Sequence, residues 1–297
     1  MERYRERRRP RSGGRGMTGF SPEWLALREP ADLAARNRQV LTACGRAFEN
    51  QETIRICDIG AGTGASVRAL TELLPRRQFW TLVDSDEKNL AAAFAQLAQW
   101  GTDIKAYDGG LMMRKGDHEL YVRSHVCDLA ATPACWPKNT DLVTASALFD
   151  LTSARWLDTF VTLLSAQKVA LLSMLTFDGV ISADPDHPQD GPIAQAFRTH
   201  QQGDKGFGPA AGPHAANVLE ASLERVGYEL EIGESPWTID RGASALLYAT
   251  LAGIAQAAQE TQTVPPEDIE HWLRSSVINT RLLTIGHRDV FARSSQT

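Results

Sequence analysis

The stretch "IRICDIGAGTGASVRAL", residues 54–70, decides the fold. An apolar run rich in isoleucine is followed by three glycines within five positions and then by an amphipathic run. This order predicts a strand, a tight turn and a helix. Glycine at such a turn lets the backbone adopt positive φ and approach a ligand, and the N–H groups at the helix N-terminus favour polar or negative groups. The stretch therefore predicts a ligand-binding loop at Gly60, Gly62 and Gly64.

Strand-like and helix-like segments alternate on both sides of this loop. Residues 17–50 predict N-terminal helices, and strands alternating with helices continue to about residue 175. Residues 178–212 are rich in Pro, Gly, Asp and His, which is typical of a substrate lid. We therefore expect an α/β fold with a doubly wound, mostly parallel sheet and a lid-like insertion after the fifth strand. Residues 17–297 would form a single domain, with 17–50 as a helical cap.

The composition is that of a globular protein without a membrane span. Of the 297 residues, 43% are hydrophobic and 23% are charged, and the longest apolar runs are shorter than a membrane span or a secretory signal needs. We expect a cytoplasmic protein with no membrane partner. Residues 1–16 are rich in arginine, whereas the rest of the chain is acidic. We interpret them as a disordered basic tail and expect no nucleic-acid partner.

The four cysteines show no CxxC pairing. Cys57 and Cys127 lie inside apolar strand-like runs, and Cys44 and Cys135 stand alone. We expect buried free thiols, with neither a disulfide nor a metal site.

The glycine loop fits two kinds of cofactor. Read as Gly60-x-Gly62-x-x-Ala65, it matches the loose dinucleotide fingerprint, and Asp84 could serve as the ribose-binding acid. A nicotinamide-dependent oxidoreductase is therefore one alternative, although the chain shows no clear Tyr-x-x-x-Lys or comparable hydride-transfer set. The fuller string, Asp58-x-Gly60-x-Gly62-x-Gly64, resembles motif I of the class I, seven-stranded S-adenosylmethionine-dependent methyltransferases.

Three further segments resemble this family in the family's order. "FWTLVDSD" is similar to the second strand, which ends in a ribose-binding acid, and "HVCDLA" to the acidic loop that contacts the adenine. "DLVTASALFDL" is similar to the fourth strand and the loop that closes over the methyl donor. The resemblance implies a Rossmann-like methyltransferase fold, with a seven-stranded sheet whose last strand is antiparallel. It also implies S-adenosyl-L-methionine as the cofactor.

The family's cofactor residues map onto matching positions of this chain. The resemblance implies that cofactor binding involves Asp58, Gly60, Ala61, Gly62, Gly64, Asp84, Asp128, Leu129 and Ser146. A leading helix often covers the cofactor in this family, so Arg28 and Arg36 are candidates for pairing with its carboxylate. A solvated helix face explains the same two arginines equally well.

The methyl acceptor is not identified by any motif. The fourth-strand loop reads "SALFD" and lacks the Asn/Asp-Pro-Pro-aromatic signature of enzymes that methylate exocyclic amines. We expect a small-molecule acceptor and in-line methyl transfer. Candidate substrate-binding residues in the insertion are Asp204, Lys205 and Phe207, and candidate catalytic residues are Asp150 and His200. His287, in the last predicted strand, is interpreted as a structural histidine at a strand bend.

Three other functions stay open beside the small-molecule methyltransferase. One is an RNA- or protein-directed methyltransferase that uses the arginine-rich tail. The second is the nicotinamide-dependent oxidoreductase, and the third is a cofactor-binding protein without catalysis. Fold analogy does not fix the chemistry, and the sequence leaves both the acceptor and the oligomeric state, a homodimer included, undecided.

Overall fold

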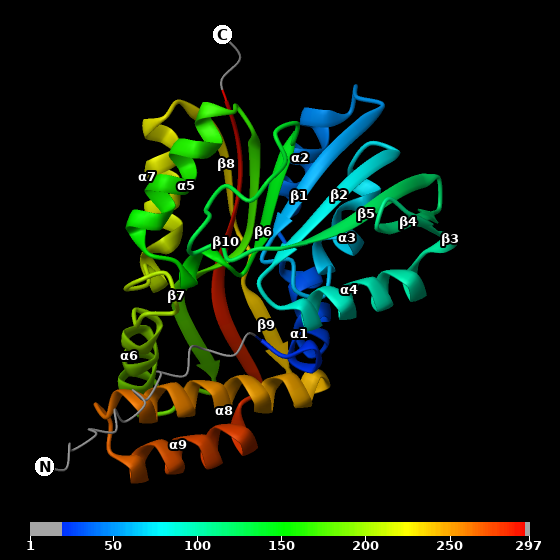
Figure 1. Ribbon diagram of the computed structural model, residues 1–297. Helices are drawn as coiled ribbons and strands as arrows, with labels where there is room; N and C mark the ends of the chain where they lie inside the picture. Colours follow the sequence, from blue (N-terminus) through cyan, green and yellow to red (C-terminus); the bar gives the residue numbers. More distant parts are fainter. Residues whose placement is uncertain (1–19, 295–297) are drawn as a thin grey trace, which may run out of the picture.

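The computed structural model describes residues 20–294, so the expected basic tail at 1–16 lies outside the described residues. One ten-stranded sheet organises the chain (Figure 1). Its order is β3 (Thr102–Tyr107), β4 (Gly110–Lys115), β5 (His118–Val126), β2 (Arg77–Asp84), β1 (Thr53–Ile59), β6 (Leu142–Ser146), β7 (Ala170–Asp184), β10 (Leu282–Ser294) and β8 (Tyr228–Glu234), while β9 (Trp237–Asp240) pairs with β10.

The centre of the sheet is parallel. Strands β5, β2, β1, β6 and β7 pair in parallel, and β10 lies antiparallel between β7 and β8. This arrangement confirms the doubly wound, Rossmann-like methyltransferase fold, including the antiparallel last strand. The strand number differs from the prediction because ten strands are present where seven were expected.

The three additional strands are β3, β4 and β9. A turn at Gly116 and Asp117 joins β4 to β5. Strand β3 was not expected: every one of its residues is exposed, so it has no alternation of buried and exposed positions that a pattern could reveal.

Helices cover both faces of the sheet, and a third group packs at one end (Figure 1). The cap expected at 17–50 consists of α1 (Pro22–Ala35) and α2 (Arg38–Phe48). The other helices are α3 (Ala65–Leu70), α4 (Glu87–Trp100), α5 (Ala154–Ala166), α6 (Asp190–Gln201), α7 (Ala215–Arg225), α8 (Ser244–Thr261) and α9 (Pro266–Asn279), with short 3-10 turns η1 (Thr71–Leu73), η2 (Phe149–Leu151), η3 (Gly212–His214) and η4 (Arg241–Ala243). In residues 20–294, no helix is both long and apolar enough to cross a bilayer.

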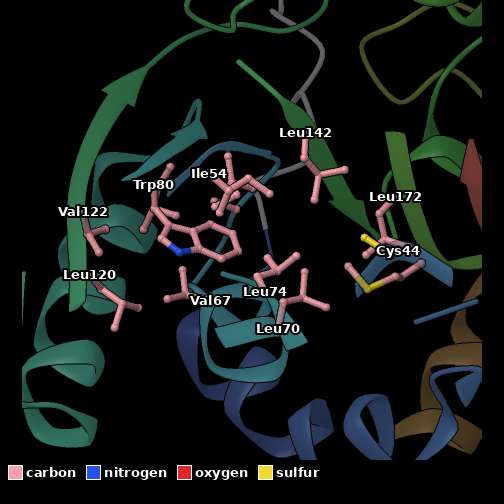
Figure 2. Packing of buried hydrophobic residues seen from close by; sticks show 14 of the residues in the cluster. Cys44, Ile54, Val67, Leu70, Leu74, Trp80, Leu120, Val122, Leu142 and Leu172 are labelled. Carbon is pink, nitrogen blue, oxygen red and sulfur yellow. The ribbon is translucent and has the colours of Figure 1, made fainter. Parts of the chain in front are cut away.

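Strand β1 contributes side chains to two hydrophobic clusters because they alternate between the faces of the sheet. Ile54 and Ile56 pack with α2, α3 and α4, in the cluster that Figure 2 shows around Trp80. Cys57 and Ile59 pack on the opposite face with α5 and α7. A third cluster joins α6, α8 and α9 to β9 and to the far ends of β7 and β10.

The insertion predicted at 178–212 begins later than expected. Strand β7 continues to Asp184 because its distal half pairs with β10, from Ile181 opposite Ile285 to Asp184 opposite Leu282. Since the partner strand lies about a hundred residues away, the local Pro and Gly content could not reveal this pairing. The remainder of the segment contains α6 and the loop that follows it.

The expectation for the cysteines is wrong in part. Cys127 and Cys135 form a disulfide with Cα atoms 6.8 Å apart, whereas Cys44 and Cys57 are free and buried. The chain between the paired cysteines folds back after β5 and brings the two sulfurs together. Their spacing in the sequence is not CxxC and does not predict this pairing. The disulfide therefore closes the loop that carries Asp128 and Leu129.

Candidate functional site

A cavity of about 360 Å³ lies where β1, β2, β5 and β6 end. Parallel strands present their carboxyl ends at one edge, which is where open α/β sheets bind ligands. The lining comes from α1, the glycine loop and the loops after β2, β5 and β6. It includes these predicted cofactor residues: Arg28, Gly60, Ala61, Gly62, Asp84, Asp128, Leu129 and Ser146.

The glycine loop needs its glycines for conformation and for close contacts. Gly60, Gly62 and Gly64 all have positive φ, at 64°, 51° and 76°. A Cβ on Gly60 would lie 3.3 Å from the Leu148 side chain, and one on Gly62 would lie 3.0 Å from Leu25 of α1. The loop is thus enclosed by the N-terminal helix on one side and the loop after β6 on the other.

Asp84 is held in place by backbone N–H groups. Its Oδ2 accepts a hydrogen bond of 2.8 Å from the Gly62 N–H, and its Oδ1 accepts one of 2.9 Å from Asp86. Burial raises the pKa of Asp84, and these two N–H groups partly oppose the shift. Each carboxylate oxygen keeps acceptor capacity, so the side chain is preoriented for a pair of ligand hydroxyls.

The loop after β5 forms the opposite wall. Asp128 accepts a hydrogen bond from the Ala130 N–H through Oδ1, at 2.9 Å, which is a local turn contact. The Leu129 carbonyl accepts from the indole N–H of Trp156 at 2.7 Å. The imidazole of His125 and the sulfurs of Cys127 and Cys135 lie within 4.8 Å of one another, and reduction of the disulfide would give them three metal-ligand atoms.

Three predicted cofactor residues lie outside the cavity lining. Gly64 caps the start of α3, and Asp58 is buried in the sheet, where it accepts a hydrogen bond of 2.6 Å from the Thr144 hydroxyl. Burial raises the pKa of Asp58 to about 6. Arg36 is buried as well, and its Nε and Nη2 have no hydrogen-bond partner among the described residues. Burial lowers the pKa of Arg36.

Helix α1 fixes Arg28 at the edge of the cavity. Glu29 of the same helix forms a bidentate ion pair with Arg68 of α3, with both contacts at 2.6 Å. Arg28 pairs with Asp32 at 3.0 Å and lies over the ring of Trp237, 4.8 Å from its centroid. The indole N–H of Trp237 in turn donates to Asp32 at 3.0 Å. This network connects the N-terminal helix to β9.

A second cavity, of about 300 Å³, adjoins the first. The two cavities share the lining residues Phe20, Arg28, Ala147, Leu151 and Lys205. The second cavity extends between α1, α6, α8 and the distal parts of β7 and β10. Its remaining walls are mainly apolar and include Trp24, Leu175, Phe177, Phe197, Trp237, Ile254 and Ile285.

The polar residues of this second cavity include both predicted catalytic candidates. Asp150 is only partly buried, yet its Oδ1 is buried without a hydrogen-bond partner among residues 20–294. Burial raises the pKa of Asp150 to about 6, while backbone N–H groups and Arg28 oppose the shift. His200 contacts Glu260 through Nε2 at 2.9 Å, and the described part of the chain offers its Nδ1 no partner.

His287 lies at a strand irregularity, as predicted, and it also lines the second cavity. The register of β10 with β7 shifts between Ile285 and His287. The histidine is only 6% exposed, and its Nδ1 lacks a partner in the described structure. Burial and nearby Arg28 lower its pKa to about 3, so the ring is neutral at physiological pH.

The three residues predicted in the lid differ in their relation to the two cavities. Lys205 lines both cavities, and burial lowers its pKa. Phe207 lines the first cavity and packs against Trp156, so it lies on the cofactor side and not on the expected substrate side. Asp204 lies outside both linings, where its Oδ1 accepts hydrogen bonds from the N–H groups of Gly206 and Gly208.

Sequence patterns did not predict the part of the second cavity contributed by α8 and β9. Trp237, Thr250 and Gly253 all line it. A signal was present in α8, where Thr250, Gly253 and Ala257 place small residues at helical spacing on one face. The sequence does not show which element faces this side of α8, so the spacing alone does not predict a cavity wall.

Comparisons with known proteins add the following findings. Neither protein-family models nor curated proteins match the sequence. Among solved structures, the chain is similar to a putative methyltransferase from Bacillus halodurans (13% identity, 87% of this chain and 100% of that one, TM-score 0.49). It is also similar to a cyclopropane synthase from Mycobacterium tuberculosis (12%, 92% and 95%, TM-score 0.48). A third is an S-adenosylmethionine-dependent methyltransferase from Geobacter sulfurreducens in complex with S-adenosyl-L-homocysteine (13%, 92% and 98%, TM-score 0.45).

Proposed function

We propose that this protein is an S-adenosylmethionine-dependent methyltransferase with a small-molecule acceptor. One observation carries the proposal: a cavity at the glycine loop and the strand-end acids opens directly onto a second, mainly apolar cavity. A methyltransferase needs a donor cavity and an acceptor cavity side by side, because the donor sulfur, the methyl carbon and the acceptor atom must lie in line.

The first cavity suits the parts of S-adenosylmethionine. Asp84, already oriented by two N–H groups, would accept hydrogen bonds from both ribose hydroxyls. Gly60 and Gly62 would lie against the amino-acid part of the cofactor without side chains in the way. Leu129 and the turn at Asp128 would border the adenine, and Arg28 would face the carboxylate. When bound, the cofactor supplies an activated methyl group on a sulfonium.

The protein's own residues would then align the acceptor and exclude water. Helix α1 closes the cofactor cavity on one side, held by the Glu29–Arg68 ion pair. Lys205 and Phe207 close it from the loop after α6. A proton-bearing acceptor also needs a base, and Asp150 would fill this role because its carboxylate lines the acceptor cavity and has a pKa of about 6.

Calorimetric titration with S-adenosylmethionine and S-adenosylhomocysteine tests the proposal, with NADH as the competing ligand. Asp84→Asn should weaken binding of both sulfur ligands by about tenfold or more, because it removes one charged acceptor. Asp117→Asn, an exposed carboxylate on the β4–β5 turn, is the matched control and should bind as wild type does. Binding of NADH alone would refute the methyltransferase and favour the oxidoreductase.

A further inference from the structure

The second cavity has a shape and a charge pattern that specify its ligand further. We propose that it binds a ring-containing acceptor with a hydroxyl group, and that Asp150 takes the hydroxyl proton while the oxygen is methylated. This inference rests on the proposed methyltransferase function, and it adds the chemical class of the acceptor.

The walls favour a flat, apolar ligand. Phe177 and Phe197 meet edge to face, with centroids 5.7 Å apart and an angle of 90°, and Trp237 lies 5.3 Å from the ring of His287. Aromatic walls of this kind contact a ring through offset or edge-to-face packing. A volume of about 300 Å³ is at the lower end for ligand pockets and suits one or two fused rings.

Helix α8 leaves the space that such a ring would occupy. Gly253 lies in the interior of this helix at an exposed position of the cavity wall, and a Cβ placed on it would meet no described atom within 4 Å. Glycine at an interior helical position costs about 1 kcal/mol relative to alanine, so helix stability does not explain its presence. One turn earlier, Thr250 lines the same cavity with a buried hydroxyl that has no partner in residues 20–294. Small side chains at both positions keep the cavity open.

The lining of the second cavity also carries the Asp150 carboxylate, but the two cations where the cavities join disfavour a cationic amine as the acceptor. Arg28 and Lys205 both lie where the two cavities join. Arg28 already covers one face of Trp237, so that face is not available to an ammonium group. The sulfonium of the methyl donor would add a further positive charge nearby. A neutral hydroxyl avoids this repulsion.

Asp150 would accept a proton from the acceptor, and His287 would bind the acceptor by a hydrogen bond. As the acceptor oxygen bonds to the methyl carbon, the carbon–sulfur bond breaks and its electron pair stays on sulfur. The hydroxyl proton passes to the Asp150 carboxylate, which leaves a methyl ether, S-adenosylhomocysteine and a protonated Asp150. The step balances without any further reactant. His287 is neutral and buried, and its unpartnered Nδ1 would hydrogen-bond a polar substituent of the ring.

The experiment uses the full chain and separates cofactor binding from acceptor binding. S-adenosylhomocysteine binding is measured first by calorimetry. The loaded protein is then titrated with two ring hydroxyls, 2-naphthol and catechol, and with two amines, benzylamine and ethanolamine. Methylated products are identified by mass spectrometry after incubation with S-adenosylmethionine. Gly253→Leu fills the cavity from α8, and Gln259→Leu, exposed on the same helix and outside the cavity lining, is its control.

We expect a ring hydroxyl to bind and to yield its methyl ether. Gly253→Leu should weaken that binding by about tenfold or more while S-adenosylhomocysteine binds as in wild type, and Gln259→Leu should change neither. If S-adenosylhomocysteine fails to bind the wild-type protein, the proposed function itself is wrong. If it binds, the inference is overturned by methylation of the amines alone, by failure of both ring hydroxyls to bind, or by ring-hydroxyl binding that Gly253→Leu leaves unchanged.

Discussion

Replacing Asp289 should destabilise the fold strongly, because this carboxylate joins three separate parts of the chain. It is completely buried in β10. Oδ1 accepts hydrogen bonds from the Leu175 N–H at 2.7 Å and the Ser235 hydroxyl at 2.6 Å, and Oδ2 accepts one from the Asn37 N–H at 2.8 Å. Asp289 therefore connects the start of α2 and the loop before β9 to β7 at Leu175, a residue with positive φ.

The expected loss in the free energy of unfolding follows from the hydrogen-bonding groups that would be left unpaired. Asp289→Ala leaves the buried Leu175 N–H, the part-buried Asn37 N–H and the buried Ser235 hydroxyl without an acceptor, at about 1–3 kcal/mol each. The burial cost of the carboxylate, which raises its pKa, is relieved in the variant and offsets part of the loss. We expect a net loss of about 3–5 kcal/mol. Asp289→Asn places an amide NH₂ against one of the donors and should cost about 1–3 kcal/mol.

The loss should also depend on pH in a defined direction. Because the folded pKa of Asp289 is raised above its ordinary value of 3.8, the native state binds its proton more tightly than the unfolded chain does. That contribution is fully present below 3.8 and is lost as the pH rises through the folded value. The deficit of Asp289→Ala should thus be larger at a pH near 3.8 than at about pH 8.

Urea unfolding followed by circular dichroism measures these differences, with Asp117→Ala as an exposed control. A deficit of less than about 1 kcal/mol for Asp289→Ala would refute the reasoning. A deficit that grows with rising pH would refute the assigned sign of the pKa shift.

Three further predictions concern function. Asp150→Asn should lower kcat by about 100-fold or more while cofactor and acceptor affinities stay within about twofold. The kcat of the wild-type enzyme should fall below about pH 6, because the base must be ionised. A wild-type kcat that does not change with pH in steady-state assays would contradict this. Cys135→Ser should weaken S-adenosylhomocysteine binding in calorimetry because it frees the loop that carries Asp128; equal affinity would show that the disulfide does not order this wall. Removal of residues 1–16 should leave turnover of a small acceptor unchanged, and loss of activity would favour the tail-dependent alternative.

Much of the first cavity could be predicted from the sequence because its residues follow strands directly. The glycine loop follows β1, Asp84 ends β2, and Ser146 ends β6, so the parallel sheet alone brings them to one edge. Arg36, the other candidate for pairing with the cofactor's carboxylate, lies outside the lining of the first cavity. Helix α1 ends at Ala35, so Arg36 lies just beyond the helix that carries Arg28, and its side chain is buried.

The second cavity could be predicted only in part: Asp150, His200 and Lys205 were candidate site residues and line it, whereas no local pattern contains its other walls. Its walls come from α1, η2, β7, α6, α8, β9 and β10, which meet only after the sheet has formed. Trp237 lies outside every motif and becomes part of the site through Asp32 and Arg28. The disulfide between Cys127 and Cys135 was missed for the same reason, since only the return of the chain after β5 brings the sulfurs together.

The contact between Arg28, Asp32 and Trp237 explains why the N-terminal helix belongs to both cavities. Arg28 lines each of them, and Asp32 receives hydrogen bonds from the guanidinium and from the indole of Trp237. A displacement of α1 would therefore also separate Asp32 from Trp237, which lines the second cavity. Glu29 anchors the same helix to α3 beside the glycine loop, so α1 is tied both to the first cavity and, through Trp237, to the wall of the second.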